Sequence, residues 1–197
     1  MVTNHGVTGY GNDQVALALD RWLPHVRPDV VILAHAPDDL WRNEPRWTYG
    51  PKRPSSLAAG RWVLAPGPVP TAEEMKRLWL RRPLLRHLPA MVAEAWRHGG
   101  EAEQVALATA IVRSQVARVE AAGAVPILVH MSIRHAPPER QGNVVQTVCA
   151  ELDIRCLDTE AALETVVEAG GAPYTPHSHH YSETALDAVA EALEPMV

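Results

Sequence analysis

The sequence lacks most of the features that mark specialised classes of protein. It contains only two cysteines in 197 residues, too few for a disulfide-rich miniprotein. It contains no uncharged apolar run of about 18 residues, the length that a membrane-spanning helix requires. Basic residues (18) are fewer than acidic ones (23), and the net charge of −5 argues against a nucleic-acid-binding domain. The contents of hydrophobic (47%) and charged (21%) residues are typical of globular proteins, which excludes a disordered tail and a collagen-like fibre.

Two further features of the sequence concern processing and redox state. The N-terminal sequence MVTNHGVTGYG has neither the basic start nor the apolar core of a signal peptide. Cys149 and Cys156 lie in apolar surroundings, where a cysteine is more often a buried thiol than part of a disulfide or a zinc site. We therefore expect two core thiols, an arrangement that allows a reducing compartment without requiring one. The length leaves room for a single domain over 1–197.

What the sequence does contain is an alternation of strand and helix patterns. Short apolar runs rich in β-branched residues predict buried parallel strands at 29–34, 124–130 and 152–157. Apolar residues at three- and four-residue spacing predict helices before, between and after these strands. The expected helices are 12–23, 101–122, 139–151, 160–169 and 183–193. This order predicts an α/β fold, a three-layer α/β/α sandwich whose parallel sheet is covered on both faces.

The segment 43–98 interrupts this alternation. Its first half, to Pro70, is rich in proline and glycine, and two helical patterns follow at 73–82 and 84–98. A long excursion from a compact domain often covers a site. A surface insertion without a role explains the segment equally well.

Ligands bind beyond the carboxyl ends of the strands in open α/β sheets, so the residues there are the first candidates for a site. His35, Asp38 and Asp39 follow the first expected strand, and Ser132 follows the second. A glycine-rich stretch at 4–11 (NHGVTGYG) leads into the first helix. Its backbone N–H groups could bind an anion or an oxyanion. Such turns are common in this fold class, so the signal alone is weak.

Three histidines within four residues precede the last helix: His177, His179 and His180. With Asp38 or Asp39 they could bind zinc, which needs three or four converging ligands. Neighbouring residues such as His179 and His180 rarely point at one ion, however. A solvated loop with incidental histidines is a second interpretation. We favour a third, a single catalytic base, because of a family resemblance.

Taken in order, these segments resemble the SGNH/GDSL hydrolase family of serine esterases and acyl hydrolases. The stretch 4–14 (NHGVTGYGNDQ) is similar to the family's second block, 28–40 with Asn43 to its third, and 180–193 to its last. The segment 52–70 is similar to an insertion in one bacterial branch. The resemblance covers nearly the whole chain in the right order.

The resemblance implies a reaction and roles for three residues. The reaction is hydrolysis of an ester or acyl bond of a small-molecule substrate by serine attack, without a metal or other cofactor. His180 would act as general base and then as general acid, and Gly9 would donate its amide to the oxyanion. Asp38 occupies the position of an oxyanion-hole asparagine. An amide donates a hydrogen bond to an oxyanion, whereas an ionised carboxylate repels it.

Two further departures affect the catalytic groups. The family's serine lies in a G-D-S motif at the end of the first strand, and neither G-D-S nor G-x-S-x-G occurs here. The carboxylate expected shortly before the histidine is also missing, because His177 and Ser178 stand there. That carboxylate fixes the histidine tautomer and stabilises the imidazolium. We therefore expect no hydrolysis of activated esters by these 197 residues alone. Ser132 is the one serine at the end of an expected strand.

Three explanations fit these departures: a truncated sequence, which we favour, a degenerate member that binds without cleaving, and altered chemistry with another nucleophile or a metal. A binding module could offer Trp41, Trp47 and Trp62 as flat apolar surfaces to a sugar or acyl chain, although the same side chains could pack the insertion onto the core. The resemblance implies that the family's first strand and the helix after it are missing here, and in the family that strand lies inside the sheet. Its loss would leave unpaired backbone groups and uncovered apolar faces. Neither the substrate nor the localisation follows from the sequence.

Overall fold

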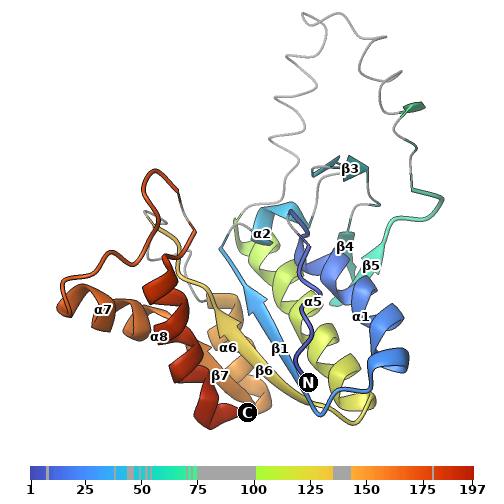
Figure 1. Ribbon diagram of the computed structural model, residues 1–197. Coiled ribbons are helices and arrows are strands. Elements are labelled where there is room, and N and C mark those ends of the chain that lie inside the picture. The colour runs from blue at the N-terminus through green and yellow to red at the C-terminus, as the bar shows by residue number, and fades with distance from the viewer. Residues whose placement is uncertain are drawn as a thin grey trace, which may run out of the picture.

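A three-stranded parallel sheet forms the centre of the protein (Figure 1). Its strands are β1 (Val30–His35), β6 (Val125–His130) and β7 (Arg155–Asp158), in the spatial order β1-β6-β7. The computed structural model describes residues 1–7, 9–37, 39–43, 47–48, 50–51, 53, 55–69, 71, 73–74, 101–134, 143–178 and 180–197. Within these residues the sheet confirms the three predicted parallel strands, with small shifts at their ends.

The helices predicted around the strands occur in the predicted order, together with two short elements, at 39–42 and 194–196, that were not predicted. They are α1 (Asn12–Val26), α2 (Asp39–Arg42), α5 (Glu101–Ala121), α6 (Asn143–Leu152), α7 (Glu160–Glu168), α8 (Glu183–Leu193) and the 3₁₀ turn η2 (Glu194–Met196). α1 continues past its expected end to Val26 and includes Pro24, which has no N–H to donate. The expected start of α6 at 139–142 lies outside the described residues. No described helix is both long and apolar enough to cross a membrane.

One face of the sheet is closed by α1, α5 and α6. Apolar side chains of these helices pack against alternate residues of β1 and β6 and are almost fully buried. The core residues are Leu19, Leu23, Leu33, Ala108, Val112, Val116, Val119, Ala124, Leu128, Val144, Val145 and Val148. On α5 these residues recur at three- and four-residue spacing, which puts them on the side of the helix that faces the sheet.

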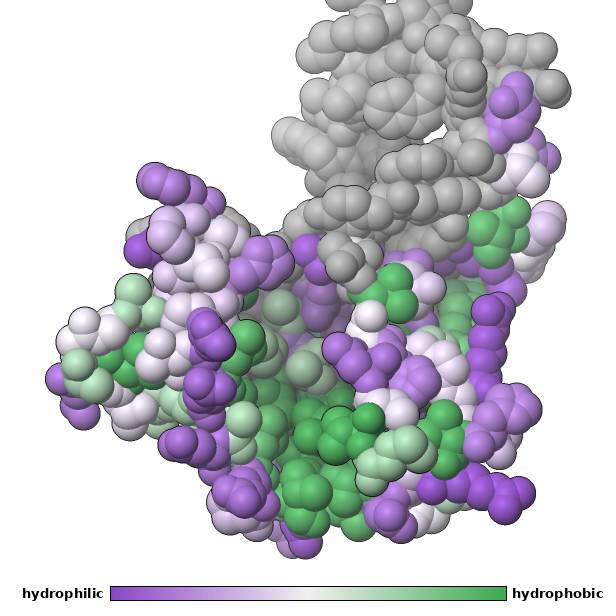
Figure 2. All heavy atoms as spheres, viewed as in Figure 1, coloured by the Kyte–Doolittle hydropathy of each residue, from purple (hydrophilic) through white to green (hydrophobic). Residues whose placement is uncertain are grey.

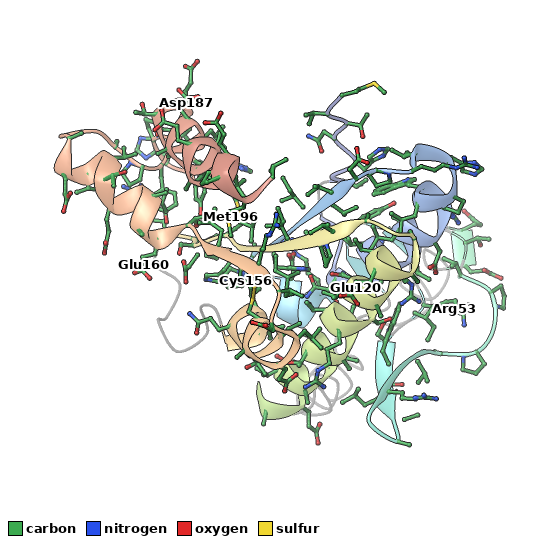
Figure 3. All side chains as sticks on the ribbon, turned by 90° about the horizontal axis from the view of Figure 1, so that it is seen from below. Arg53, Glu120, Cys156, Glu160, Asp187 and Met196 are labelled. Atoms are coloured by element: carbon green, nitrogen blue, oxygen red, sulfur yellow. A yellow bond between two sulfur atoms is a disulfide. The ribbon has the colours of Figure 1, made fainter. Side chains whose placement is uncertain are left out.

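The opposite face is covered only in part. α7 and α8 pack together and form a second apolar cluster with Met131 and Leu157, and Figure 3 shows α8 on the side of the sheet opposite α5 and α6. On the strands, Ile32 of β1 is 46% exposed and Val125 of β6 is 42% exposed. Figure 2 shows apolar side chains gathered between α8 and α1. Helices therefore flank the sheet as predicted, but the described residues leave these side chains of the second face partly exposed.

β1 is also an edge strand. Its inner side pairs with β6 from Val30 to His35, and no described strand pairs with its outer side. The N-terminal segment 1–7 forms no strand and is largely exposed. A ring contact between His5 and Trp22, with centroids 4.3 Å apart, ties this segment to α1.

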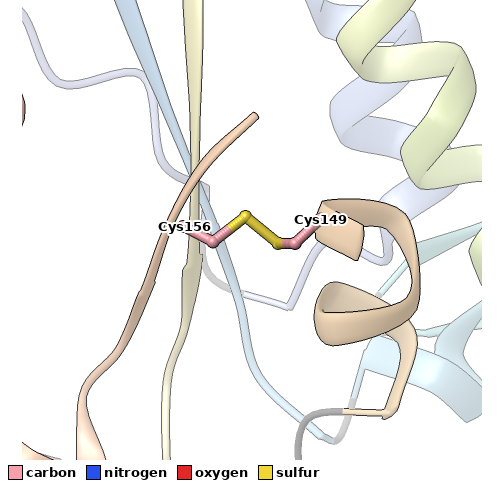
Figure 4. The surroundings of a disulfide bond; sticks show 2 residues. All are labelled: Cys149 and Cys156. Atoms are coloured by element: carbon pink, nitrogen blue, oxygen red, sulfur yellow. A yellow bond between two sulfur atoms is a disulfide. The ribbon is translucent and has the colours of Figure 1, made fainter. Parts of the chain in front are cut away.

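Cys149 and Cys156 form a disulfide that joins α6 to β7 (Figure 4). The expectation of two free thiols is therefore wrong, although both residues do pack against the core. α6 ends at Leu152, and Asp153 reverses the chain with a left-handed backbone (φ 53°). The reversal brings the two Cα atoms to 6.2 Å, a separation that a disulfide spans.

Part of the insertion forms hairpins. β2 (Trp47–Thr48) pairs with β3 (Gly50–Pro51), and β4 (Ser55–Ala58) pairs with β5 (Arg61–Leu64), both antiparallel. Ala59 (φ 50°) and Gly60 (φ 72°) make the turn between β4 and β5. The expected helices at 73–82 and 84–98 lie almost wholly outside the described residues.

Candidate functional site

The glycine-rich turn that leads into α1 lies at the carboxyl end of β1. Gly9 has a left-handed backbone (φ 81°), which glycine adopts without the steric cost of a Cβ. A hydrogen bond of 2.8 Å between Asn12 Oδ1 and His35 Nδ1 holds the start of α1 at the end of β1. No acceptor among the described residues takes the Gly9 amide. The expected oxyanion donor therefore lies at the edge of the sheet where ligands bind in this fold class.

The same turn is fixed to the segment that follows β1. A Cβ on Gly11 would lie 3.1 Å from the carbonyl oxygen of Arg42 in α2, so a side chain here would require α2 to shift by a few tenths of an ångström. Gln14 Oε1 accepts a hydrogen bond from the Gly11 amide at 3.2 Å. Asn43 Oδ1 accepts one from the amide of Asp13, also at 3.2 Å. These contacts hold α2 against the start of α1.

A buried polar group anchors the hairpin β4–β5 to α1. Asp13 is 1% exposed and accepts a hydrogen bond from Ser55 Oγ at 2.9 Å. Ser55 Oγ in turn accepts one from Trp62 Nε1 at 3.0 Å. The Trp62 ring packs against an apolar cluster that includes Ile111, and the Arg118 guanidinium lies 5.3 Å from its centroid. Trp62 therefore packs the insertion onto the core, and its ring is not a free platform for a ligand.

Two buried histidines lie next to each other at the ends of β1 and β6. His35 and His130 are partners in the strand register, and each is 4% exposed. Burial lowers the pKa of His35 to about 4, and His130 acts in the same direction. Burial also lowers the pKa of His130, against the opposing charges of Asp158 and Glu160. Because Asn12 Oδ1 only accepts, neutral His35 carries its proton on Nδ1 and a lone pair on Nε2.

The loop that carries His180 is attached to the end of β6. Tyr181 is buried, and its hydroxyl donates to the Ser132 carbonyl at 2.8 Å. The Thr175 amide donates to the His180 carbonyl at 2.9 Å, while the His180 side chain is exposed. The structure thus places His180 beside β6 and Gly9 beside β1, at the same edge of the sheet. No hydrogen bond joins these two residues.

Other predicted site residues are only partly described. Asp38 and His179 lie outside the described residues. His177 has a left-handed backbone (φ 59°). Ser178 stands near the position of the expected acid, and its Oγ accepts from the His180 amide at 3.1 Å. Within the described ranges no group of three or more histidine, cysteine or acidic side chains could hold a metal ion.

Two of the other described serines have structural roles. Ser55 donates to Asp13 in the buried group, and Ser182 Oγ caps α8 by accepting from the Ala185 amide at 3.2 Å. Ser132 differs, because its hydroxyl is buried with no partner in the described part of the chain. Among the described residues no imidazole forms a hydrogen bond with that hydroxyl, the contact by which a base activates a serine.

Comparison with known proteins gives no assignment. No family model, no curated protein and no solved structure matches the chain. Two site residues that the sequence did not single out are His130 and Thr159, which end or follow apolar strands. An isolated polar residue at a strand end is too common to signal a site.

Proposed function

We propose that this chain carries the base and an oxyanion donor of an SGNH-type hydrolase of ester or acyl bonds, and that a strand paired with the outer side of β1 supplies the serine. The observation that carries this proposal is that no strand in the described part of the chain pairs with the outer side of β1. This edge adjoins the uncovered face at Ile32. It also ends at His35, which is hydrogen-bonded to Asn12 at the start of α1, shortly after Gly9.

The handedness of the crossovers supports a strand at this edge. α1 and α5 pack on the same face of the sheet, and the chain runs from β1 through α5 to β6 on the inner side. Right-handed crossovers whose helices lie on one face of a sheet all place the next strand on the same side of the previous one. A strand preceding α1 would therefore lie beyond the outer side of β1. A crossover leading outward from that edge would place its helix on the opposite face, over Ile32.

The proposed mechanism assigns each step to a named group. The serine oxygen bonds to the substrate's carbonyl carbon while His180 takes the hydroxyl proton. The carbonyl electron pair moves to oxygen, where the Gly9 amide stabilises the charge. Collapse of this intermediate breaks the bond to the leaving group, which takes the proton from His180. Water then attacks the acyl-serine in the same way, with His180 taking its proton and returning it to the serine oxygen, and the carboxylic acid is released.

Asp38 gives a first prediction. At an oxyanion position its carboxyl group must be protonated or turned away, since an ionised carboxylate would repel the developing charge. In a serine-bearing form of the protein, Asp38→Asn should raise kcat by about tenfold or more, because an amide donates a hydrogen bond there. A fall in kcat would remove Asp38 from the oxyanion hole.

The proposal is tested by comparing p-nitrophenyl acetate hydrolysis in two proteins. One is the 197-residue chain, and the other is an extended chain that includes the coding sequence upstream of Met1. The first should hydrolyse the ester no faster than its His180→Ala variant. The extended chain should show saturable turnover that His180→Ala lowers by about a thousandfold or more. A folded but inactive extended chain would contradict the proposal. Saturable turnover by the 197 residues, lost in His180→Ala, would instead implicate Ser132 or a metal-bound water.

A further inference from the structure

The hydroxyl of Tyr181 belongs to a closed ring of hydrogen bonds at the carboxyl end of β6. The Ser132 amide donates to Thr159 Oγ1 at 3.0 Å, Thr159 Oγ1 and the Tyr181 hydroxyl are 2.7 Å apart, and Tyr181 donates to the Ser132 carbonyl at 2.8 Å. All three residues are buried. The ring joins three places that are distant in sequence: the end of β6, the start of α7 and the loop before α8.

The direction of every hydrogen bond in the ring follows from the chemistry of the groups. The Ser132 carbonyl only accepts, so the Tyr181 proton points at it. The Thr159 proton must then point at the Tyr181 oxygen. Each hydroxyl donates once and accepts once, and bonds arranged in such a chain strengthen one another. The ring requires a protonated Tyr181, and burial raises the pKa of this phenol to about 12.

The ring acts on His180 through the backbone. Tyr181 pairs with Tyr174 in an isolated antiparallel bridge, and neighbouring residues of an extended segment point to opposite sides. With Tyr181 turned inward, the adjacent His180 is turned outward, in agreement with its exposed side chain. The Thr175 amide fixes the His180 carbonyl from the other side of the loop. We propose that Tyr181 is the positioning residue for His180, holding it through the loop backbone in place of the absent orienting carboxylate.

This inference rests on the proposed function for the role of His180, but its first test does not need activity. The test measures amide hydrogen exchange in the 197-residue chain for Thr175 and Ser182, whose amides bond within the loop at 2.9 and 3.0 Å. Tyr181→Phe should speed their exchange about tenfold. The matched control is Tyr174→Phe, which removes only a long contact of 3.4 Å to the Ser132 carbonyl and should change the rates by less than about twofold.

The amides of Val125 and Leu163, bonded to Asp29 and Thr159, report whether the fold survives. If Tyr181→Phe unfolds the chain, Thr159→Val breaks the same ring and must speed the same two loop amides. Unchanged exchange of Thr175 and Ser182 in a folded ring variant overturns the proposal. An equal increase of these two exchange rates in Tyr174→Phe also overturns the proposal.

A second measurement separates positioning from general stability. In the extended chain, Tyr181→Phe should lower kcat about tenfold with KM unchanged. The effect should vanish in the His180→Ala background, because a residue that acts through His180 contributes nothing without it. A loss that persists in that background overturns the positioning role. An extended chain without activity would refute the proposed function, while the exchange measurement would still decide whether Tyr181 holds the loop.

Discussion

The two faces of the sheet differ sharply. On the face closed by α1, α5 and α6, β1 and β6 bury Leu33 and Leu128 in one continuous core. On the other face α7 and α8 cover β7, and Ile32 of β1 is 46% exposed. Parallel sheets are normally covered on both faces. The difference shows that the strands have sequences suited to a buried sheet, whereas the described residues form only part of the second helical layer.

The largest expected difference between the faces is in stability. Leu128→Ala should lower the free energy of unfolding by about 3 kcal/mol, because it leaves a cavity in the closed core. Ile32→Ala should cost under about 1 kcal/mol, because its side chain is already exposed. Urea unfolding of the two variants measures both values. Equal losses would show that Ile32 is covered in solution and would remove the contrast between the faces.

The next effect is a pH dependence of the free energy of unfolding, which arises from His35 at the carboxyl end of β1. The folded pKa of His35 is about 4 and its ordinary value is 6.5, so on acidification the unfolded chain binds the proton first. The contribution of neutral His35 is complete above about pH 6.5, decreases as the pH falls to about 4 and is constant below that, a loss of about 3 kcal/mol. Unfolding free energies at about pH 7.5 and about pH 5 should therefore differ less for His35→Gln than for the unsubstituted chain.

A smaller effect concerns the disulfide, which ties α6 on the closed face to β7. Replacing Cys149 and Cys156 together by serine should lower the free energy of unfolding by about 2.5 kcal/mol, because the unfolded chain regains the freedom of a short closed loop. In thermal unfolding, reductant should lower the midpoint temperature of the unsubstituted chain to about that of the double variant. It should not change the midpoint of the double variant. A reductant effect of the same size in both proteins would show that the disulfide does not form.

Much of the fold could be predicted because the signals are local. The β-branched run in β1 and the helical spacing in α5 each act within one element. The disulfide could not be predicted, because the turn at Asp153 that brings Cys149 to Cys156 depends on how α6 docks on β7. The hairpin turn at Ala59 was not expected either, since its positive φ is uncommon for alanine.

The candidate site was predictable in its order along the chain but not in its connections. The glycine turn and His180 do lie at the carboxyl edge of the sheet, as the position of strand ends in this fold class indicates. The ring through Thr159 and Tyr181 joins residues that no sequence pattern relates. Sequence reasoning also missed that Trp62 is held by Ser55, because the bond depends on the pairing of β4 with β5.

The open face can be tested directly by thiol labelling at two exposed apolar positions. Ile32 on β1 is 46% exposed and Leu186 on α8 is 54% exposed, and the native cysteines are held in the disulfide. In the 197-residue chain, Ile32→Cys and Leu186→Cys should react with a thiol reagent at similar rates. In the extended chain, Ile32→Cys should react at least about tenfold more slowly, since an added strand and helix would cover it, and Leu186→Cys should be unchanged. Equal reactivity of Ile32→Cys in both proteins would contradict completion of the site at the edge of β1.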